Sequence, residues 1–252
     1  MIEVINPTIQ KRIEDYKHLP LGGKEVVTPY FINNKRRKDL RAMVGKGTPE
    51  EIVMEARIWE KLKGINLSGL EADSIKQFLS NRGLGIDCSG FIVHILDSYY
   101  KEKKHRAVWH YLKIPQKSFM AKLRYWLRPV EQLGAEIITN KDNCIEVQLK
   151  DVMPGDLIRS KAKKTNGHHI MIVSVVERNE DRDVVKIEYT HSTPHYKNLN
   201  GIKTGVIEVT DSNKPLQEQR WLELDEAGIN NTLEGFLTNV EDNGIRRLKS
   251  FN

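Results

Sequence analysis

The chain has 252 residues, of which 39% are hydrophobic and 29% charged, as expected for a globular protein with a substantial core. Two cysteines are too few for a disulfide framework, and no apolar run approaches the roughly 18 residues that a membrane span needs. The net charge of +6 suits contact with an anionic polymer, such as cell wall or nucleic acid, but is too small to establish either.

The first ten residues lack a basic segment followed by an apolar one, which is the pattern of a secretory signal. We therefore expect a cytoplasmic protein, with export as the alternative if the substrate is cell wall.

Helical patterns dominate residues 1–82, which we expect to form an N-terminal helical extension. Ile9, Ile13 and Tyr16 recur at helical spacing, and a Gly-containing loop follows at residues 20–23. A basic run at residues 35–41 is most simply a solvated face, and the alternative is an anion-binding patch.

The clearest helix start is at residue 48. Thr48 and Glu51 can form a capping box, and Pro49 suits the first helical position. Gly64 ends the amphipathic pattern, and a second helix is predicted at residues 70–79.

Residues 85–92, Gly-Ile-Asp-Cys-Ser-Gly-Phe-Ile, contain a lone thiol between an acid and a hydroxyl. Apolar residues recur at helical spacing over residues 91–99, so Cys88 is predicted at the first turn of a buried helix. The positive end of a helix lowers the pKa of a thiol and makes it a better nucleophile. The alternative is a structural cysteine that packs as a small apolar residue.

A basic, aromatic region follows at residues 101–127. Phe119, Leu123 and Trp126 fit one face of a helix, so packing in the core is the favoured interpretation. Rings lining a groove beside an active site are the alternative.

From residue 136 the pattern changes to short strands separated by polar turns, which makes the expected fold class α+β. Strands at residues 169–176 and 184–190 flank a polar loop and form a predicted β-hairpin. The helix of Cys88 is expected to pack on an antiparallel sheet of about five strands, and we assign no role to the tail at residues 226–252. The other expected strands are at residues 136–139, 144–149, 156–160, 205–210 and 220–224.

Two histidines are candidates for acid–base chemistry with Cys88. His169 opens one strand of the predicted hairpin and His191 closes the other, so antiparallel pairing should bring them together. A cysteine nucleophile needs a base and a residue that orients the base. Adjacent strand residues point to opposite faces, so we expect His169 to face the helix of Cys88 and His168 to face away.

A zinc site built from His168, His169, His191 and His195 is the metal alternative. It is disfavoured because neighbours on a strand cannot easily share an ion, and no Cys pair or carboxylate stands at ligand spacing. We therefore expect no metal and no cofactor.

The residues that carry this chemistry resemble the NlpC/P60 family of papain-like cysteine peptidases. The matching pieces are Asp87-Cys88-Ser89-Gly90-Phe91, the turn Pro154-Gly155-Asp156, His169 before an apolar strand, and His191 at the end of the next strand. The resemblance covers residues 83–195. It implies a catalytic domain at residues 83–225 with an insertion at about 101–140.

The resemblance also implies roles for individual residues. Cys88 would be the nucleophile, His169 the base and His191 the residue that orients His169, while Asp87 and Ser89 are candidate substrate-binding residues. Members of the family typically cleave bacterial cell-wall peptides, so a peptide is the expected partner and nucleic acid is not. The alternatives are an amidase or acyltransferase on the same scaffold, or a non-catalytic module that binds an anionic polymer.

Overall fold

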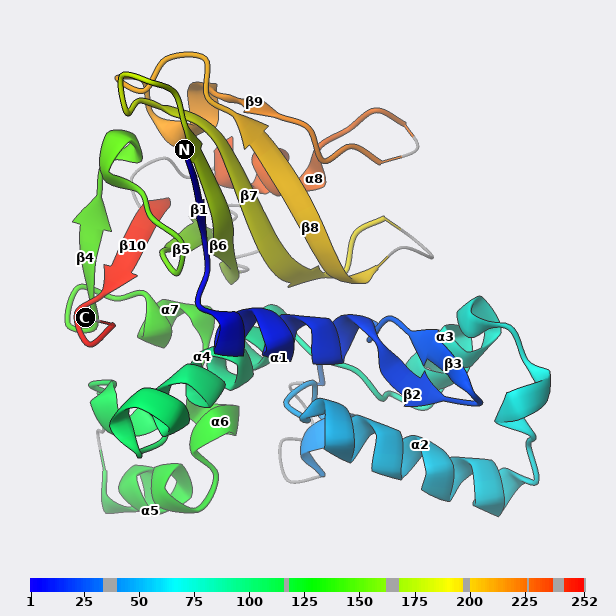
Figure 1. Cartoon of the computed structure of the whole chain (residues 1–252). Helices are drawn as coiled ribbons and strands as arrows, with labels where there is room; N and C mark the ends of the chain where they lie inside the picture. The colour runs from blue at the N-terminus through cyan, green and yellow to red at the C-terminus, as the bar shows by residue number, and fades with distance from the viewer. Residues whose placement is uncertain are drawn as a thin grey trace.

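An antiparallel sheet forms one layer of the molecule and most of the helices form a second layer against it, as Figure 1 shows for the computed structural model. The structure describes residues 1–33, 40–115, 118–161, 168–196, 200–225, 227–237 and 243–251. The expected α+β class is confirmed. Within the described ranges, no helix combines the length and apolar composition that crossing a bilayer requires.

The α-helices are α1 (Pro7–Lys17), α2 (Pro49–Lys63), α3 (Ala72–Asn81), α4 (Cys88–Lys104), α5 (Phe119–Leu127), α6 (Pro129–Gln132), α7 (Ala135–Ile138) and α8 (Asn231–Leu237). The strands are β1 (Ile2–Val4), β2 (Leu19–Leu21), β3 (Lys24–Val26), β4 (Cys144–Val147), β5 (Leu157–Lys161), β6 (His168–Arg178), β7 (Val184–Thr193), β8 (Gly201–Glu208), β9 (Arg220–Trp221) and β10 (Gly244–Leu248).

Local signals in the sequence placed the first helices correctly. The capping box of α2 is present, with Thr48 and Glu51 satisfying each other's backbone N–H groups, and Gly64 ends the helix in the left-handed conformation. Of the basic run at residues 35–41, residues 35–39 lie outside the described part of the chain. Arg41 is described and forms an ion pair with Glu51.

Within the described residues the main sheet has eight strands, so the expectation of about five was wrong. The described strands run in the order β4-β10-β5-β6-β7-β8-β9, and β1 pairs with β6. β10, from the tail to which no role was assigned, lies between β4 and β5. β1, from the N-terminal extension, also joins the sheet, so the two ends of the chain complete it.

Two short segments adopt a different structure from the expected one. The strand expected at residues 136–139 is replaced by the helix α7 and its C-cap Thr139, and the loop expected at residues 20–23 is the end of β2 and the turn of the β2–β3 hairpin. A short apolar run fits either a strand or one helical turn, so periodicity cannot separate them.

The sheet carries a hydrophobic core on both faces. On one face, Ile170 and Ile172 of β6 belong to the cluster that contains the buried apolar residues of α4. On the other face, Met171 and Val173 pack with a cluster that includes Tyr189. Alternate residues of β6 therefore point to different cores, and this decides where the histidines at its start lie.

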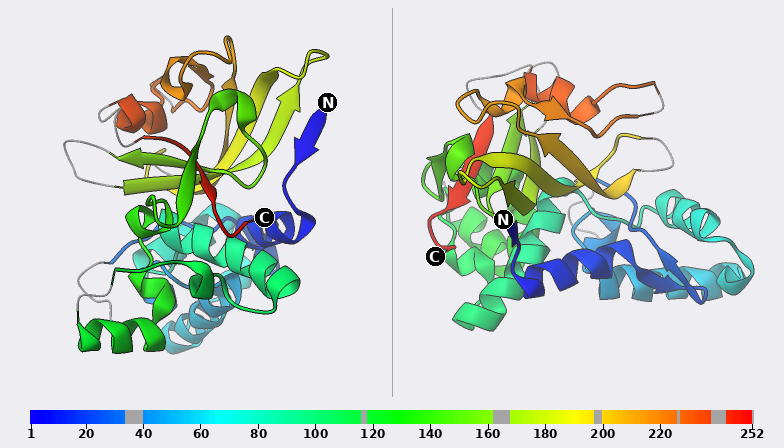
Figure 2. Two further views of the ribbon diagram at one scale, coloured as in Figure 1. Left: turned by 90° about the vertical axis from the view of Figure 1, so that its left-hand side faces the viewer. Right: turned by 45° about the horizontal axis from the view of Figure 1, so that its top comes forward.

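The packing expected for the aromatic residues of α5 was wrong. Phe119 is 77% exposed, Trp126 78% and Leu123 39%, and none of the residues of α5 is buried. α5 runs along the surface at the end of the helical layer, far from the sheet (Figures 1 and 2).

We expect the C-terminal strand to be essential for stability. Ile245 on β10 is 3% exposed, so Ile245→Ala should lower the free energy of unfolding by about 2–5 kcal/mol through lost burial and a cavity. Ile145 on the adjacent strand β4 is 50% exposed, and Ile145→Ala should cost less than about 1 kcal/mol. Urea unfolding of both variants measures the difference. Equal effects would show that β10 adds no buried core.

Candidate active site

Cys88 is the first residue of α4, as the sequence predicted. Asp87 caps the helix, and its Oδ1 accepts a hydrogen bond from the N–H of Gly90 at 2.6 Å. The thiol is nearly buried, with Cys88 7% exposed. The cap fixes the direction of the first turn and with it the position of the sulfur.

A buried lysine that the sequence gave no reason to select holds this helix start in place. Lys46 Nζ donates to Asp87 Oδ1 at 2.9 Å and to Ser89 Oγ at 2.5 Å. Ser89 in turn donates to Asp87 Oδ1 at 3.0 Å. Lys46 and Asp87 are 41 residues apart in sequence. A β-bridge between Lys46 and Ile86 brings their two segments together.

The thiol lies against the first residues of β6. Cys88 Sγ is 3.7 Å from the carbonyl oxygen of His168, and the N–H of Ile170 also points at the sulfur. The sulfur therefore contacts the backbone on both sides of His169.

The start of α4 occupies the space between the ends of β6 and β7. At this end, the last residues paired between the two strands are Ile172 and Thr190. Beyond them, Ser192 donates to the carbonyl oxygen of Ile86 at 2.7 Å.

His169 and His191 meet as the hairpin argument predicted. His169 Nε2 lies 2.8 Å from His191 Nδ1. His191 Nε2 lies 2.9 Å from Glu223 Oε1, and both of these side chains are almost inaccessible. A continuous hydrogen-bonded chain therefore runs from His169 through His191 to a buried carboxylate.

Glu223 is the residue of this chain that the sequence did not identify. It follows β9, and Tyr189 and Thr232 donate to its Oε2 at 2.7 and 3.2 Å. Burial alone would raise the pKa of Glu223, but the charge of His191 and the hydrogen bonds from His191 and Tyr189 outweigh it and lower the pKa to about 2. The only sequence signal was an acid within an expected strand, and nothing in its spacing linked it to His191.

The ionised Glu223 determines which ring nitrogens carry protons. A carboxylate only accepts, so His191 Nε2 is a donor and the Nδ1 of neutral His191 is an acceptor. A charged His191 would donate to His169 Nε2, whereas a neutral His191 accepts from it, which leaves the lone pair of a neutral His169 on Nδ1. We assign this tautomer to His169, and it leaves Nδ1 free to take a proton.

Burial keeps both candidate reacting groups neutral in the resting protein. It raises the pKa of Cys88 to about 12, with a further increase from Asp87 that Lys46 and two backbone N–H groups oppose. It also lowers the pKa of His169 to about 3. The expectation that the helix N-terminus lowers the pKa of Cys88 was wrong, because desolvation exceeds the effect of the helix end.

A cavity of about 530 Å³ opens at Cys88. The residues that line it show which histidine at the start of β6 lies on the side of α4. His168 lines this cavity with Cys88, and its Nε2 lies 3.6 Å from Glu136 Oε2. By alternation His168 shares the α4 face with Ile170, whereas His169 is on the face of Met171. The expectation that His169 faces α4 and His168 points away was therefore wrong for both residues: the register is shifted by one, and Cys88 contacts the backbone on either side of His169.

The two predicted substrate-binding residues also border the cavity. Asp87 and Ser89 line it, but Asp87 Oδ1 and Ser89 Oγ are engaged with Lys46 and with each other. Their observed contacts position the helix start, and contact with substrate stays a prediction.

The four histidines of the zinc alternative do not form a metal-binding group. In the described ranges, no three His, Cys, Asp or Glu side chains converge in a way that could hold an ion. His169 and His191 instead share a hydrogen bond.

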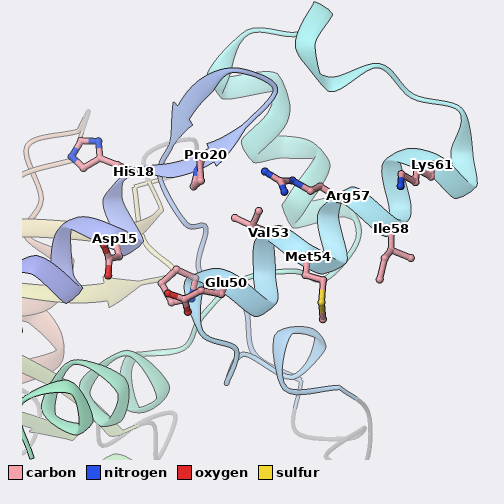
Figure 3. Close-up of a pocket in the computed structure, with 10 residues that line it drawn as sticks. Asp15, His18, Pro20, Glu50, Val53, Met54, Arg57, Ile58 and Lys61 are labelled. Carbon is pink, nitrogen blue, oxygen red and sulfur yellow. The ribbon is translucent and has the colours of Figure 1, made fainter. Parts of the chain in front are cut away.

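A larger hollow of about 690 Å³ lies between α1, α2 and the β2–β3 hairpin (Figure 3). Val53 and Arg57 point toward Pro20 across it, and Glu50 at its edge is paired with Arg12. Its lining includes neither Cys88 nor Cys144, so it is separate from the Cys88 cavity.

Comparison with known proteins adds no relative. No family model, no curated protein and no solved structure matches the chain. The function must therefore be argued from the site.

We expect the alkylation of Cys88 to depend steeply on pH. Because the pKa of Cys88 is raised, the thiolate fraction should increase about tenfold per pH unit from about pH 6 to about pH 9, without a plateau. Iodoacetamide labelling of a Cys144→Ser variant, followed by mass spectrometry, measures this rate for Cys88 alone. A plateau at neutral pH would show that a thiolate–imidazolium pair forms in the resting protein.

The carboxylate should control the tautomers of both histidines. In Glu223→Gln, the neutral amide can donate as well as accept, so His191 should no longer be held in a single tautomer. The free energy of unfolding should fall by about 1–3 kcal/mol. Histidine ¹⁵N chemical shifts and urea unfolding measure these effects, with the exposed Glu218→Gln as a control. An unchanged His191 tautomer would contradict the assignment.

Proposed function

We propose that this protein is a cysteine hydrolase that cleaves a peptide or amide bond through a thioester. The observation that carries the proposal is the chain His169–His191–Glu223, which starts on β6 at the residue whose neighbouring backbone groups contact the helix N-terminal thiol of Cys88. A structural cysteine would need no buried histidine pair backed by a carboxylate. A papain-like arrangement, as implied by the NlpC/P60 resemblance, is part of the proposal.

The reaction begins with a neutral thiol and a neutral imidazole. His169 Nδ1 takes the proton of Cys88 as the sulfur attacks the carbonyl carbon of the substrate. His169 then returns the proton to the leaving amine as the carbon–nitrogen bond breaks. Water, activated by the same nitrogen, hydrolyses the thioester and regenerates the thiol.

The remaining groups stabilise charge during these steps. The positive charge that His169 acquires is shared along its hydrogen bond to His191 and opposed by Glu223. The backbone N–H of Cys88 belongs to the first turn of α4, where N–H groups have no acceptor within the helix. It can donate to the oxyanion that forms on the substrate.

The two neighbouring histidines have different proposed roles. His169 is the base because its Nε2 is tied to His191, which fixes the lone pair on Nδ1. His168 lies in the cavity beside Glu136, so it contacts the bound substrate. A cell-wall peptide is the substrate implied by the resemblance, and transfer of the acyl group to an amine would use the same thioester.

Variants of the reacting groups test the proposal. Cys88→Ala should abolish turnover, and His169→Ala should lower kcat/KM by about 10²–10⁴-fold because the general base is lost. His168→Ala should act mainly on KM, with kcat reduced less than about tenfold. His191→Asn should retain part of the activity, since an amide oxygen can accept from His169.

The assay is mass spectrometry of cell-wall peptides and of protein amides after incubation, with Cys144→Ser as the matched control for the thiol. Full turnover by Cys88→Ala would refute the hydrolase proposal. A severe His168→Ala and a mild His169→Ala would instead transfer the role of base to His168.

A further inference from the structure

The outward face of α5 is an apolar surface that no other described element covers. It consists of Phe119, Met120, Leu123, Trp126 and Leu127, with exposed fractions of 77%, 55%, 39%, 78% and 61%. Soluble proteins rarely expose several large apolar side chains side by side. Where they do, the exposed patch usually marks an interaction site. The apolar face of α5 is therefore a candidate docking face, and the charges beside it indicate the kind of partner that it fits.

The apolar residues form one continuous stripe along α5. At about 100° per residue, the five positions fall within an arc of about 120°. Lys122 borders the stripe on one side and Arg124 on the other, and both are exposed. The opposite side of the helix faces the protein, where Tyr125 donates to the carbonyl oxygen of Trp109 at 2.6 Å. α5 is thus attached by its back and presents its apolar side outward.

The charged residues on the stretch of chain that carries the stripe are all basic, and the first acid after it, Glu131, is buried and paired with Arg128. From residue 107 to residue 130 the sequence contains no Asp or Glu. Its Lys and Arg residues in this range are Lys113, Lys117, Lys122, Arg124 and Arg128. The complementary partner is therefore anionic, and it must also accept exposed Phe and Trp rings.

We propose that α5 docks on the surface of a lipid bilayer that contains anionic lipids. A helix with Trp, Phe and Leu on one face and Lys and Arg beside them lies in the interface of a membrane, with the rings among the headgroups and acyl chains. A second copy of this chain is a poorer partner. A twofold contact between two α5 faces would bring like charges together.

The position of α5 gives this docking a consequence for the candidate site. α5 ends at Leu127, and only Arg128 separates it from α6. Glu131 and Gln132 of α6 line the Cys88 cavity. A bilayer bound at α5 therefore lies at the end of the segment that forms one wall of the cavity. The docking itself does not depend on the proposed hydrolase activity.

Vesicle flotation with the full-length protein tests the proposal. We expect the protein to float with vesicles of phosphatidylcholine and phosphatidylglycerol, and to float less as salt is added. It should stay behind with phosphatidylcholine alone. Phe119→Ser with Trp126→Ser should lower partitioning at least about tenfold, because each ring contributes more than about 1.4 kcal/mol when buried. Lys122→Glu with Arg124→Glu should also weaken binding.

A matched control is the pair Ile58→Ser and Leu62→Ser on α2, whose side chains are 43% and 69% exposed. This control should bind vesicles as the unmodified protein does. Absence of anion-dependent flotation would overturn the proposal. Unchanged binding by the Phe119/Trp126 variant would also overturn it, since adsorption would then rest on charge alone. A dimer in light scattering that the same variant abolishes would assign the face to self-association instead.

Discussion

The buried ion pair between Lys46 and Asp87 is the contact on which the geometry around Cys88 depends. The two groups are 2.9 Å apart and their side chains are 9% and 5% exposed. Lys46 also donates to Ser89 and to the carbonyl oxygen of Leu133, so one ammonium joins three separate segments of the chain. Removing one partner of such a pair leaves an uncompensated buried charge, at a cost of about 3–5 kcal/mol. The same pair acts on the thiol in opposite directions, because Asp87 raises the pKa of Cys88 and Lys46 lowers it.

The sheet separates two kinds of environment, and the start of β6 borders both. The α4 face is apolar and holds the nucleophile at the end of a rigid helix. The other face carries His169, His191, Tyr189 and Glu223 in a hydrogen-bonded cluster. Because the strands β6 and β7 stop pairing before their ends, the thiol can lie against the backbone of β6. The proposed chemistry therefore depends on an interruption in the sheet as much as on the side chains.

Burial explains why the resting site is neutral and also why it includes a carboxylate. A buried imidazole is a poor base by itself, as the lowered pKa of His169 shows. An ionised Glu223 at the far end of the chain orients His191 and can offset the positive charge that develops on His169. The interaction with His191 and the hydrogen bond from Tyr189 lower the pKa of that carboxyl and hold it ionised in a place where it would otherwise be too costly.

Local sequence signals were sufficient for features that form within a few residues. The capping box of α2, the start of α4 at Cys88 and the β6–β7 hairpin all follow from residues that are close in the chain. The hairpin also placed His169 next to His191, since the turn fixes which strand ends meet.

Features that join distant segments were settled by tertiary packing alone. Glu223 is 32 residues from His191, Lys46 is 41 from Asp87, and β10 lies between two strands that precede it by far in the sequence. Alternation along β6 shows that His168 and His169 lie on opposite faces of the sheet. Only the packing of β6 on α4 decides which of the two lies on the α4 face. The outward orientation of α5 was likewise undetermined by its pattern. An amphipathic helix has the same periodicity whether its apolar side faces a core or an interface, and only the surrounding structure distinguishes the two.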